Sequence, residues 1–398
     1  MTAPDRAPVR IAHLGLGAFH RAHQAWFTEV VNRAGGEQWG IAAFTGRRPD
    51  AGAALAAQDC RYDLVVRGPE ADVVEPISAI VAALDGADAE AWREALSTVA
   101  VLTVTVTEAG YAPDSAAVRR IVDGLRARRD AGEGPIAIVS CDNLDGNGEL
   151  LGRLVREAAE ADEALSAWIE QNASFISSMV DRITPAVADA LPITVTDDPC
   201  AVVTEPAASW VLSGDFPAGR PAWELAGAEF VDDIAPYEQR KLWLLNAGHT
   251  LLASLGQLRG HATVAEAMTD PVCREALVEL WDDAAEVLPF DADELEHQRA
   301  VITERFENAR IRHALRQIAT DAGIKLGVRV IPVIQTRLAA GLPAGHGEIR
   351  ALAAWGALEG HDATAIAARY DLDDVVREEL IGVIAELKPD VRTEGVHA

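Results

Sequence analysis

The sequence predicts an α/β fold in which a mostly parallel sheet carries helices on both faces. Two observations indicate it. A strand-like run at residues 9–14 passes through a glycine-containing turn into a helical stretch. Apolar or β-branched runs then alternate with helical stretches up to residue 140, which is the pattern of βαβ units. With 398 residues, 49% of them hydrophobic, the chain can also form a second domain.

The individual elements follow from this alternation. Strands are expected at 9–14 (VRIAHL), 40–45 (GIAAFT), 99–107 (VAVLTVTVT) and 135–140 (PIAIVS). Helices are expected between them, at 21–33, 53–59, 89–97 and 115–131. Ligands bind such sheets at the carboxyl ends of the strands. The residues that fall there are Gly15, Gly46, Thr107 and Asn143.

The turn after the first strand suits a dinucleotide phosphate. Gly15 and Gly17 let the backbone turn tightly and approach a pyrophosphate, whose charge rests on the N-terminus of the next helix. The usual third glycine is replaced by His20, so the motif alone fits an ordinary strand-to-helix turn equally well. Strand, turn and helix together form the phosphate-binding unit of a Rossmann domain, and we expect Phe19, His20 and Arg21 to contact the cofactor.

The end of the second strand normally distinguishes NAD from NADP, because an acid there binds the ribose 2′-hydroxyl and an arginine accommodates a 2′-phosphate. Here the residues are Gly46, Arg47 and Arg48. Two arginines leave NADP open, although two solvated loop cations are an equal interpretation. Thr107, Glu108 and Asn143 complete the expected cofactor contacts.

A second polar group lies in the apolar run Lys241-Leu-Trp-Leu-Leu-Asn246-Ala-Gly-His249. We expect one helix over about 236–255, begun near Pro236 and stopped at Gly256. On an ideal α-helix the amine, amide and imidazole lie at about 0°, 140° and 80°, on one side of the cylinder. These groups can move a proton and a hydride at a carbinol carbon. The structural alternative is a lysine that reaches solvent, an asparagine at a kink and a core histidine.

Composition excludes several classes. The net charge of −27 disfavours nucleic acid and anionic lipid surfaces. The cysteines have no Cys-x-x-Cys spacing, so we expect reduced thiols rather than disulfides or a zinc ribbon. No apolar run reaches the length of a membrane helix, and residues 1–10 lack the apolar core of a signal peptide, so we expect a cytoplasmic protein. The oligomeric state cannot be read from the sequence.

A metal site is the alternative for the region after the glycine turn. His20 and His23 are three residues apart, and Glu29 follows. Zinc needs three or four ligands with supporting hydrogen bonds, and no further cluster completes this set. We therefore expect no metal, with His20 beside the cofactor and His23 packed on the following helix.

Six segments together resemble the signature segments of the polyol-specific long-chain dehydrogenases, also called the mannitol dehydrogenase family. They are GLGAFHRAHQAWFTE (15–29), TVTEAGY (105–111), SCDNLDGNGE (140–149), MVDRITP (179–185), GRPAWE (219–224) and KLWLLNAGHTLLASLG (241–256). The resemblance runs in order from about residue 10 to 340. It implies a Rossmann-type N-terminal domain, a mainly α-helical C-terminal domain, and metal-free catalysis in the cleft between them. We place these domains at 1–230 and 231–398.

The resemblance also assigns roles to residues. It places the family's catalytic lysine, amides and imidazole on Lys241, Asn143, Asn246 and His249. It places two substrate contacts on Asp181 and Lys325, although Asp321-Ala-Gly-Ile precedes Lys325 where the family usually has Asp-Gly-Ser.

The expected mechanism is proton removal from an alcohol while its hydride passes to a nicotinamide. Lys241 is the expected base, for which burial and neighbouring donors would have to lower its pKa from about 10.4 toward neutrality. Asn143 and Asn246 would donate to the developing alkoxide, like an oxyanion hole. His249 would orient the lysine or hold a hydroxyl, and Asp181 would accept another hydroxyl or fix His249. The alternative base is His249, whose ordinary pKa is near 6.5.

The sequence therefore predicts a metal-independent oxidoreductase that uses NAD or NADP and interconverts a sugar alcohol and a 2-ketose. One alternative substrate is a sugar acid such as fructuronate or tagaturonate, for whose carboxylate Lys325, Arg329 and Arg337 are available. A second alternative is a cofactor-binding sensor without catalysis. The intact set of polar residues on an apolar helix argues against the sensor.

Overall fold

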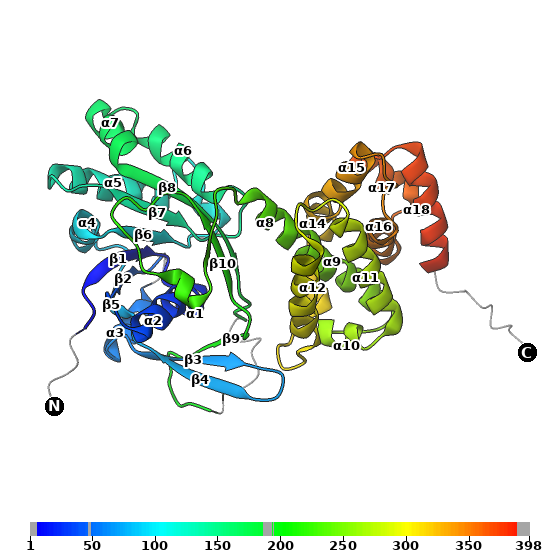
Figure 1. Ribbon diagram of the computed structural model, residues 1–398, viewed down its shortest axis with the longest axis horizontal. Helices are drawn as coiled ribbons and strands as arrows, with labels where there is room; N and C mark the ends of the chain where they lie inside the picture. The colour runs from blue at the N-terminus through cyan, green and yellow to red at the C-terminus, as the bar shows by residue number, and fades with distance from the viewer. Residues whose placement is uncertain (1–5, 47–48, 186–192, 194, 388–398) are drawn as a thin grey trace, which may run out of the picture. The chain divides into compact units, whose positions relative to one another are not determined.

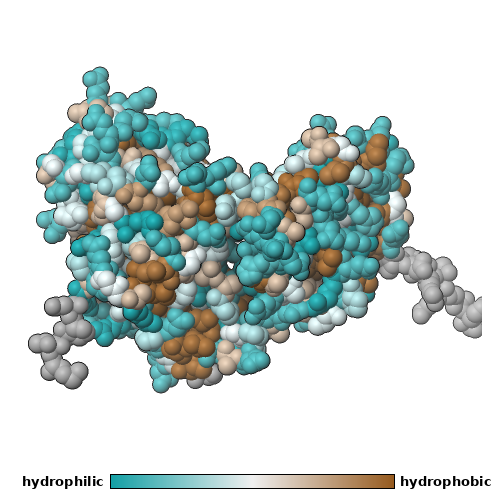
Figure 2. Space-filling view, in the orientation of Figure 1, coloured by the Kyte–Doolittle hydropathy of each residue, from teal (hydrophilic) through white to brown (hydrophobic). Residues whose placement is uncertain are grey.

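The computed structural model describes residues 6–46, 49–185, 193 and 195–387. The chain divides into two compact units, Met1–Tyr237 and Glu238–Ala398. Among the described residues, no helix combines the length and the apolar character needed to cross a bilayer. The face shown in Figure 2 is mostly hydrophilic, with apolar colour in separate patches, in keeping with 62 acidic against 35 basic residues.

The N-terminal unit is built on an eight-stranded sheet (Figure 1). Its strands are β1 (Val9–Leu14), β2 (Gly40–Phe44), β5 (Ile80–Leu84), β6 (Val101–Val104), β7 (Ile136–Ser140), β8 (Ala173–Asp181), β10 (Ser209–Ser213) and β11 (Glu229–Phe230). The order is β11-β10-β8-β7-β6-β1-β2-β5, and the six strands from β5 to β8 are parallel. These six have the 3-2-1-4-5-6 order of a Rossmann sheet, so the direction of winding reverses between β1 and β6.

Helices cover both faces of this sheet, which confirms the expected doubly wound fold (Figure 1). Adjacent residues of β1 show why: Ile11 packs into one apolar cluster and Ala12 into another. One face carries α4 (Ala89–Thr98), α5 (Ala116–Asp130), α6 (Asn147–Ala159) and α7 (Glu163–Asn172). The other carries α1 (Ala18–Ala22), α2 (Gln24–Ala34), α3 (Asp50–Ala57) and the 3-10 turn η2 (Trp223–Ala226).

Two expected elements differ in extent. The single helix expected at 21–33 is broken at His23, whose backbone leaves the helical region and whose Nε2 lies 2.9 Å from the Ser209 carbonyl oxygen. The strand expected at 99–107 ends at Val104. Beyond it, Thr105 bonds to the Gly15 carbonyl and Thr107 has a positive φ, so the chain turns away from the sheet.

A small second sheet was not predicted from the sequence. It consists of β4 (Asp72–Ile77), β3 (Tyr62–Arg67) and β9 (Val202–Thr204), in that order. Arg67 and Asp72 form a buried ion pair of 3.0 Å across the hairpin. Strand β9 begins at Val202, 135 residues after β3 ends at Arg67. Local sequence patterns therefore give no sign that β9 joins this sheet.

The C-terminal unit is mainly helical, as the family resemblance implied. Its first helix, α8 (Ala235–Arg240), crosses the boundary between the units, and a π-helix, η3 (Lys241–Asn246), follows it directly. The remaining helices are α9 (Ala247–Leu258), α10 (Val264–Met268), α11 (Pro271–Ala285), α12 (Ala292–Glu307), α13 (Leu315–Ile318), α14 (Ala322–Arg329), α15 (Ile331–Ala339), α16 (His346–Glu359), α17 (Ala363–Tyr370) and α18 (Asp374–Leu387). Helix α9 packs against α10, α11, α13, α14 and α16 and so forms the centre of the unit.

The stop expected at Gly256 is wrong, because α9 continues to Leu258. A Cβ atom at Gly256 would lie 2.7 Å from Leu315 Cδ1 and 3.1 Å from Ala267 Cβ. This glycine therefore permits close packing of neighbouring helices rather than ending its own.

Candidate functional site

The glycine turn after β1 is fixed by contact with the end of β6. Gly15 has φ +112°, and a Cβ there would lie 1.8 Å from the Thr105 carbonyl oxygen, so only glycine fits. Gly17 has extended backbone, and the nearest atom to a Cβ there is 3.6 Å away. The protein itself therefore leaves space beside Gly17, as a turn that receives a pyrophosphate requires.

Arg21 and Phe19 follow this turn and are half-buried. The Arg21 guanidinium donates to the Cys200 carbonyl oxygen at 2.6 Å, and burial lowers its pKa. Arg21 is thus already used to tie α1 to the segment before β9. Its predicted contact with the cofactor remains a prediction, as does that of Phe19.

His20 is fully buried behind the turn and stacks on His13, with ring centroids 3.3 Å apart. His13 is held by Thr103 Oγ1 at 2.8 Å and Thr105 Oγ1 at 3.0 Å. Burial lowers the pKa of His13 to about 3 and that of His20 well below its ordinary value, so both rings are neutral at pH 7. The predicted contact of His20 with the cofactor remains a prediction. His13 was not predicted from the sequence. The feature that could have indicated it is a polar residue inside an apolar strand.

The loop after β6 is strained and firmly held. Thr107 has φ +64° and ψ 169°, a region that a β-branched residue rarely occupies. The buried carboxylate of Asp142 accepts hydrogen bonds from Val106 N at 2.9 Å, Thr107 N at 2.8 Å and Tyr111 Oη at 3.1 Å. Burial is the largest influence on the Asp142 carboxyl and raises its pKa. The exposed Thr107 and Glu108 are therefore presented by a rigid loop.

Asn143 directly follows Asp142 and is exposed. The loop that carries it is anchored by Asn147, whose Nδ2 donates to the carbonyl oxygens of Asp142 and Ser178, both at 2.8 Å. Asn147 Oδ1 accepts from Ser178 N at 3.0 Å. Asp142 and Asn147 were not predicted as site residues, although both lie in the segment 140–149 that resembles the family.

The predicted residues of this unit share one edge of the sheet. Gly15 follows β1, Gly46 follows β2, Thr107 and Asn143 follow β6 and β7, and Asp181 ends β8. These strands are parallel, so their carboxyl ends meet at the edge where Rossmann sheets bind ligands. Arg47 and Arg48 lie outside the described residues, so the choice between NAD and NADP remains a prediction.

In the C-terminal unit, the expected single α-helix is wrong over Lys241–Asn246, which forms a π-helix. A buried donor and a half-buried one bind carbonyl oxygens of this segment: Trp281 Nε1 binds that of Leu244 at 2.9 Å, and Arg329 Nη1 binds that of Asn246 at 3.2 Å. Groups that bind inside the hydrogen-bond ladder deform a helix, and π-turns are frequent at functional sites.

The π-turn also changes which side chains share a face. Its i→i+5 hydrogen bonds widen the turn, so Lys241 and Asn246 lie closer to one line than the roughly 140° of an ideal α-helix. Lys241, Asn246 and His249 are half-buried, whereas their neighbours Trp243 to Leu245 are buried. The His249 ring packs on Phe306, with centroids 4.4 Å apart. The run therefore presents three polar groups from an apolar helix.

Lysine is rare in this chain, which gives its positions weight. Of the 35 Lys and Arg residues, three are lysines: Lys241, Lys325 and Lys388. An arginine stays protonated in proteins, whereas a lysine can lose its proton in a desolvated site. For two of the three, Lys241 and Lys325, the sequence predicts roles at the substrate. Lys325 Nζ donates to the Ile318 carbonyl oxygen at 2.8 Å, and burial and Arg329 lower its pKa.

Comparison with known proteins agrees with this geometry. Residues 9–225 match the mannitol dehydrogenase Rossmann domain and residues 233–381 the mannitol dehydrogenase C-terminal domain. The chain belongs to the mannitol dehydrogenase family. Two relatives are the D-mannonate oxidoreductase of Escherichia coli, 34% identical over 84% of this chain and 76% of the relative, and the D-arabinitol 4-dehydrogenase of Ralstonia nicotianae, 37% identical over 84% and 80%.

A solved structure supports the same family. The Pseudomonas fluorescens mannitol 2-dehydrogenase, in a ternary complex with NAD and D-mannitol, matches with a TM-score of 0.77 and 28% identity over 96% of this chain and 91% of that one. The oxidoreductase class and a nicotinamide cofactor expected from the sequence are thereby confirmed for this member of the mannitol dehydrogenase family. The roles of individual residues are not tested by these similarities.

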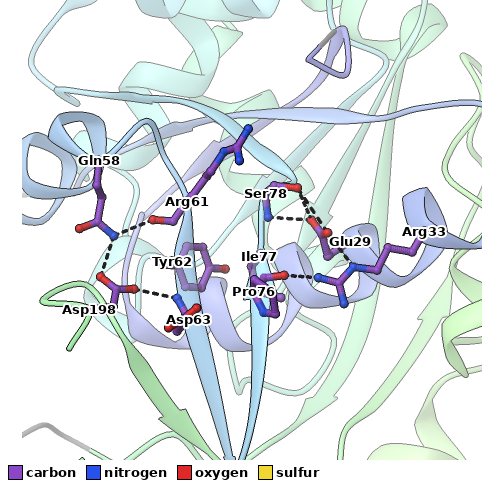
Figure 3. Close-up of a pocket in the computed structure, with 10 residues that line it drawn as sticks. All are labelled: Glu29, Arg33, Gln58, Arg61, Tyr62, Asp63, Pro76, Ile77, Ser78 and Asp198. Carbon is purple, nitrogen blue, oxygen red and sulfur yellow. Dashed lines mark hydrogen bonds and ion pairs between the residues drawn. The ribbon is translucent and has the colours of Figure 1, made fainter. Parts of the chain in front are cut away.

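A separate pocket of about 530 Å³ lies in the N-terminal unit of this family member (Figure 3). Its lining residues are Glu29, Arg33, Gln58, Arg61, Tyr62, Asp63, Pro76, Ile77, Ser78 and Asp198. Glu29, once considered as a metal ligand, accepts hydrogen bonds from Ser78 N at 2.7 Å and Arg33 Nε at 2.9 Å. Several polar groups of this pocket bind one another, and none of the predicted site residues lines it.

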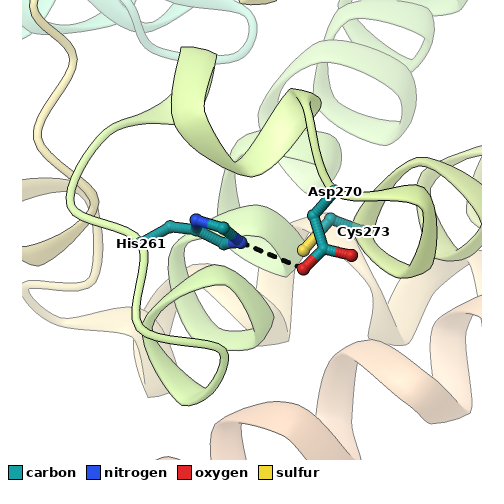
Figure 4. A group of neighbouring side chains, drawn as sticks. All are labelled: His261, Asp270 and Cys273. Carbon is teal, nitrogen blue, oxygen red and sulfur yellow. Dashed lines mark hydrogen bonds and ion pairs between the residues drawn. The ribbon is translucent and has the colours of Figure 1, made fainter.

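A group with metal-ligating side chains occurs in the C-terminal unit, where His261, Asp270 and Cys273 come together (Figure 4). His261 Nε2 lies 3.0 Å from Asp270 Oδ2, and Arg259 also binds this carboxylate. Burial raises the pKa of the Cys273 thiol to about 11, so it is protonated at neutral pH. Asp270 accepts from Val272 N and caps α11. This arrangement is therefore an ion pair at the N-terminal cap of α11.

Replacing Asp270 with asparagine is expected to reduce the acid sensitivity of this protein. Arg259 and His261 hold the pKa of Asp270 below its ordinary value. The ion pair therefore stabilises the native state above pH about 4 and is lost as the pH falls through the lowered pKa. Asp270→Asn keeps a helix cap but should lose about 0.2–1 kcal/mol of the free energy of unfolding at pH 7, and less at pH 3. Thermal unfolding at both pH values measures this, and an equal loss at both would contradict it.

Proposed function

We propose that this protein oxidises a secondary hydroxyl group of a sugar alcohol or a related polyhydroxy compound to the 2-ketose, with a nicotinamide cofactor, and catalyses the reverse reduction. The observation that supports this most is the π-turn, which presents Lys241 and Asn246 from an apolar helix with His249 one turn beyond. An amine, an amide and an imidazole can supply the base and the hydrogen-bond donors that metal-free alcohol oxidation uses.

The described residues suit a dinucleotide. A pyrophosphate fits the open space beside Gly17, next to Gly15, which only glycine can occupy. Thr107, Glu108 and Asn143 lie at the same carboxyl edge of the sheet. The nicotinamide, when bound, supplies the hydride acceptor. NAD and NADP both remain open, because the choice depends on the segment with Arg47 and Arg48.

The chain's own residues would handle the proton and the developing charge. We propose that Lys241 takes the hydroxyl proton and that Asn143 and Asn246 donate hydrogen bonds to the substrate oxygen. Asp181 and Lys325 would contact further substrate groups. His249 would orient the lysine or hold a hydroxyl. The rarity of lysine in this chain and the packing of His249 against Phe306 favour Lys241 over His249 as the base.

The test is turnover by the purified protein, followed as nicotinamide reduction at 340 nm. D-mannitol, D-arabinitol and D-mannonate, the compounds named for the relatives, are each offered with NAD and with NADP. We expect reduction of one cofactor by at least one compound, and we expect prior dialysis against EDTA to leave the rate unchanged. Cofactor binding without turnover of any polyol or sugar acid would instead favour the catalytically silent sensor.

A further inference from the structure

Two cations on α14 lie beside the π-turn. Lys325 and Arg329 are four residues apart and so lie on one side of this helix, which packs against η3 and α9. Arg329 Nη1 donates to the Asn246 carbonyl oxygen at 3.2 Å and to Thr250 Oγ1 at 3.0 Å. A guanidinium therefore rests on the same helical run that carries Lys241, Asn246 and His249.

No ion pair joins Lys325 or Arg329 to a carboxylate in the part of the chain that the structure describes, and Arg329 Nε is buried without a hydrogen-bond acceptor. Burial lowers the pKa of Arg329 to about 10. Burial and Arg329 lower the pKa of Lys325, against a smaller opposing influence of Asp321. Like charges four residues apart on a helix repel. The arrangement is thus unfavourable for the protein alone.

This pair stands out in a protein with a net charge of −27, where acidic residues are plentiful. Arg337, which the sequence offered as a third cation, shows the contrast. Its guanidinium is buried and pairs with Asp283 and Glu286 at 3.2 and 3.1 Å. Arg337 is therefore paired with carboxylates of the protein, whereas Arg329 is not, and Lys325 has Asp321 only as a weaker electrostatic neighbour. Uncompensated buried charge is a mark of functional sites, where a ligand supplies the missing partner.

The geometry points to a carboxylate subsite: Arg329, with Lys325, binds the carboxylate of the substrate, so that the substrate is a sugar acid rather than a neutral polyol. This inference rests on the proposed function and names the substrate class of the same site. Arg329 touches the helix at Asn246 and Thr250, one to two turns beyond Lys241. The charged end of the substrate therefore lies away from the carbon that reacts with the base.

The experiment compares kcat/KM for D-mannonate and D-mannitol, which share a carbon skeleton and differ in a carboxylate against a hydroxymethyl group. Wild-type protein should prefer D-mannonate. Arg329→Gln should lower the ratio of kcat/KM for mannonate over mannitol roughly tenfold to a hundredfold, the effect of losing one charged hydrogen bond. Arg329→Lys keeps the charge and should restore part of the ratio. Arg316→Gln removes an exposed arginine of α13 and should leave the ratio at the wild-type value.

Each possible result supports or overturns either the carboxylate subsite or the proposed function. Turnover of D-mannitol in preference to D-mannonate would overturn the carboxylate subsite and leave the proposed function standing. An equal loss for both substrates in Arg329→Gln, with a lower unfolding temperature, would show that Arg329 only holds the π-turn in place. Turnover of neither compound, nor of D-arabinitol, would overturn the proposed function itself. A fall in the ratio with the unfolding temperature retained supports the inference.

Discussion

Lys241→Ala is expected to lower kcat for alcohol oxidation about 10²- to 10⁴-fold, the range over which a general base contributes to an enzymatic rate. The amine is removed from a half-buried position on an apolar helix, where no neighbouring lysine of η3 or α9 can replace it. In the wild-type protein kcat should rise with pH as the base loses its proton. In the variant this dependence should disappear, because the titrating group is gone. Steady-state rates from pH 6 to 10 measure both effects.

Two further variants separate the base from a charge. Lys241→Arg keeps a cation that does not deprotonate, so it should be as slow as Lys241→Ala if the lysine acts as a base. Tight binding of NADH to both variants, followed by fluorescence, shows that the cofactor site is intact. If His249→Gln abolished the pH dependence while Lys241→Ala preserved it, the base would be His249.

Asn143→Ala and Asn246→Ala are each expected to raise the activation barrier by about 2.7–4 kcal/mol, which is roughly 10²- to 10³-fold in kcat. Each amide is proposed to donate to the oxygen that becomes an alkoxide, and a donor of this kind acts mainly in the transition state. The loss should therefore fall on kcat with little change in KM. Single-turnover rates with saturating polyol or sugar acid measure the chemical step directly.

Asn172→Ala provides the matched control for these amides. Asn172 donates to the Trp168 carbonyl oxygen within α7 and has no proposed catalytic role, so its loss should leave kcat within twofold. The double variant of Asn143 and Asn246 should lose less than the product of the single effects, because the two donors would serve one oxygen. A rise in KM alone in either single variant would contradict the oxyanion role and indicate ground-state binding.

Local signals account for what the sequence predicted well. The strands β1, β2 and β7 and the helices α4 and α5 follow from runs of apolar or alternating residues, which depend on near neighbours in the chain. The glycine turn was also predicted, because Gly15 and Gly17 directly follow a strand-like run. In the structure Gly15 adopts a positive φ beside the end of β6. The parallel order then places Gly15, Gly46, Thr107, Asn143 and Asp181 at one edge of the sheet.

Tertiary contacts account for what the sequence could not predict. The π-turn depends on Trp281 and Arg329, which approach its carbonyl groups from 37 and 83 residues away along the chain. Asp142 acts on Thr107 from the loop after a different strand, and the strain of Thr107 becomes visible only in its backbone angles. Arg329 looked equivalent to Arg337 until their partners were known. A pattern within one segment contains none of this information.

The π-turn makes the proposed active surface depend on the kind of helical turn as well as on the identity of its residues. Its widened hydrogen-bond ladder holds more chain in one turn than an α-helix does. If the run Lys241–Asn246 closed as an α-helix of the same length, Asn246 and every later side chain would turn by roughly 90° relative to the lysine. The helix would persist, yet His249 would face a different direction. The direction of Lys241 relative to His249 is therefore linked to the contacts that Trp281 and Arg329 make with carbonyl oxygens of the π-turn.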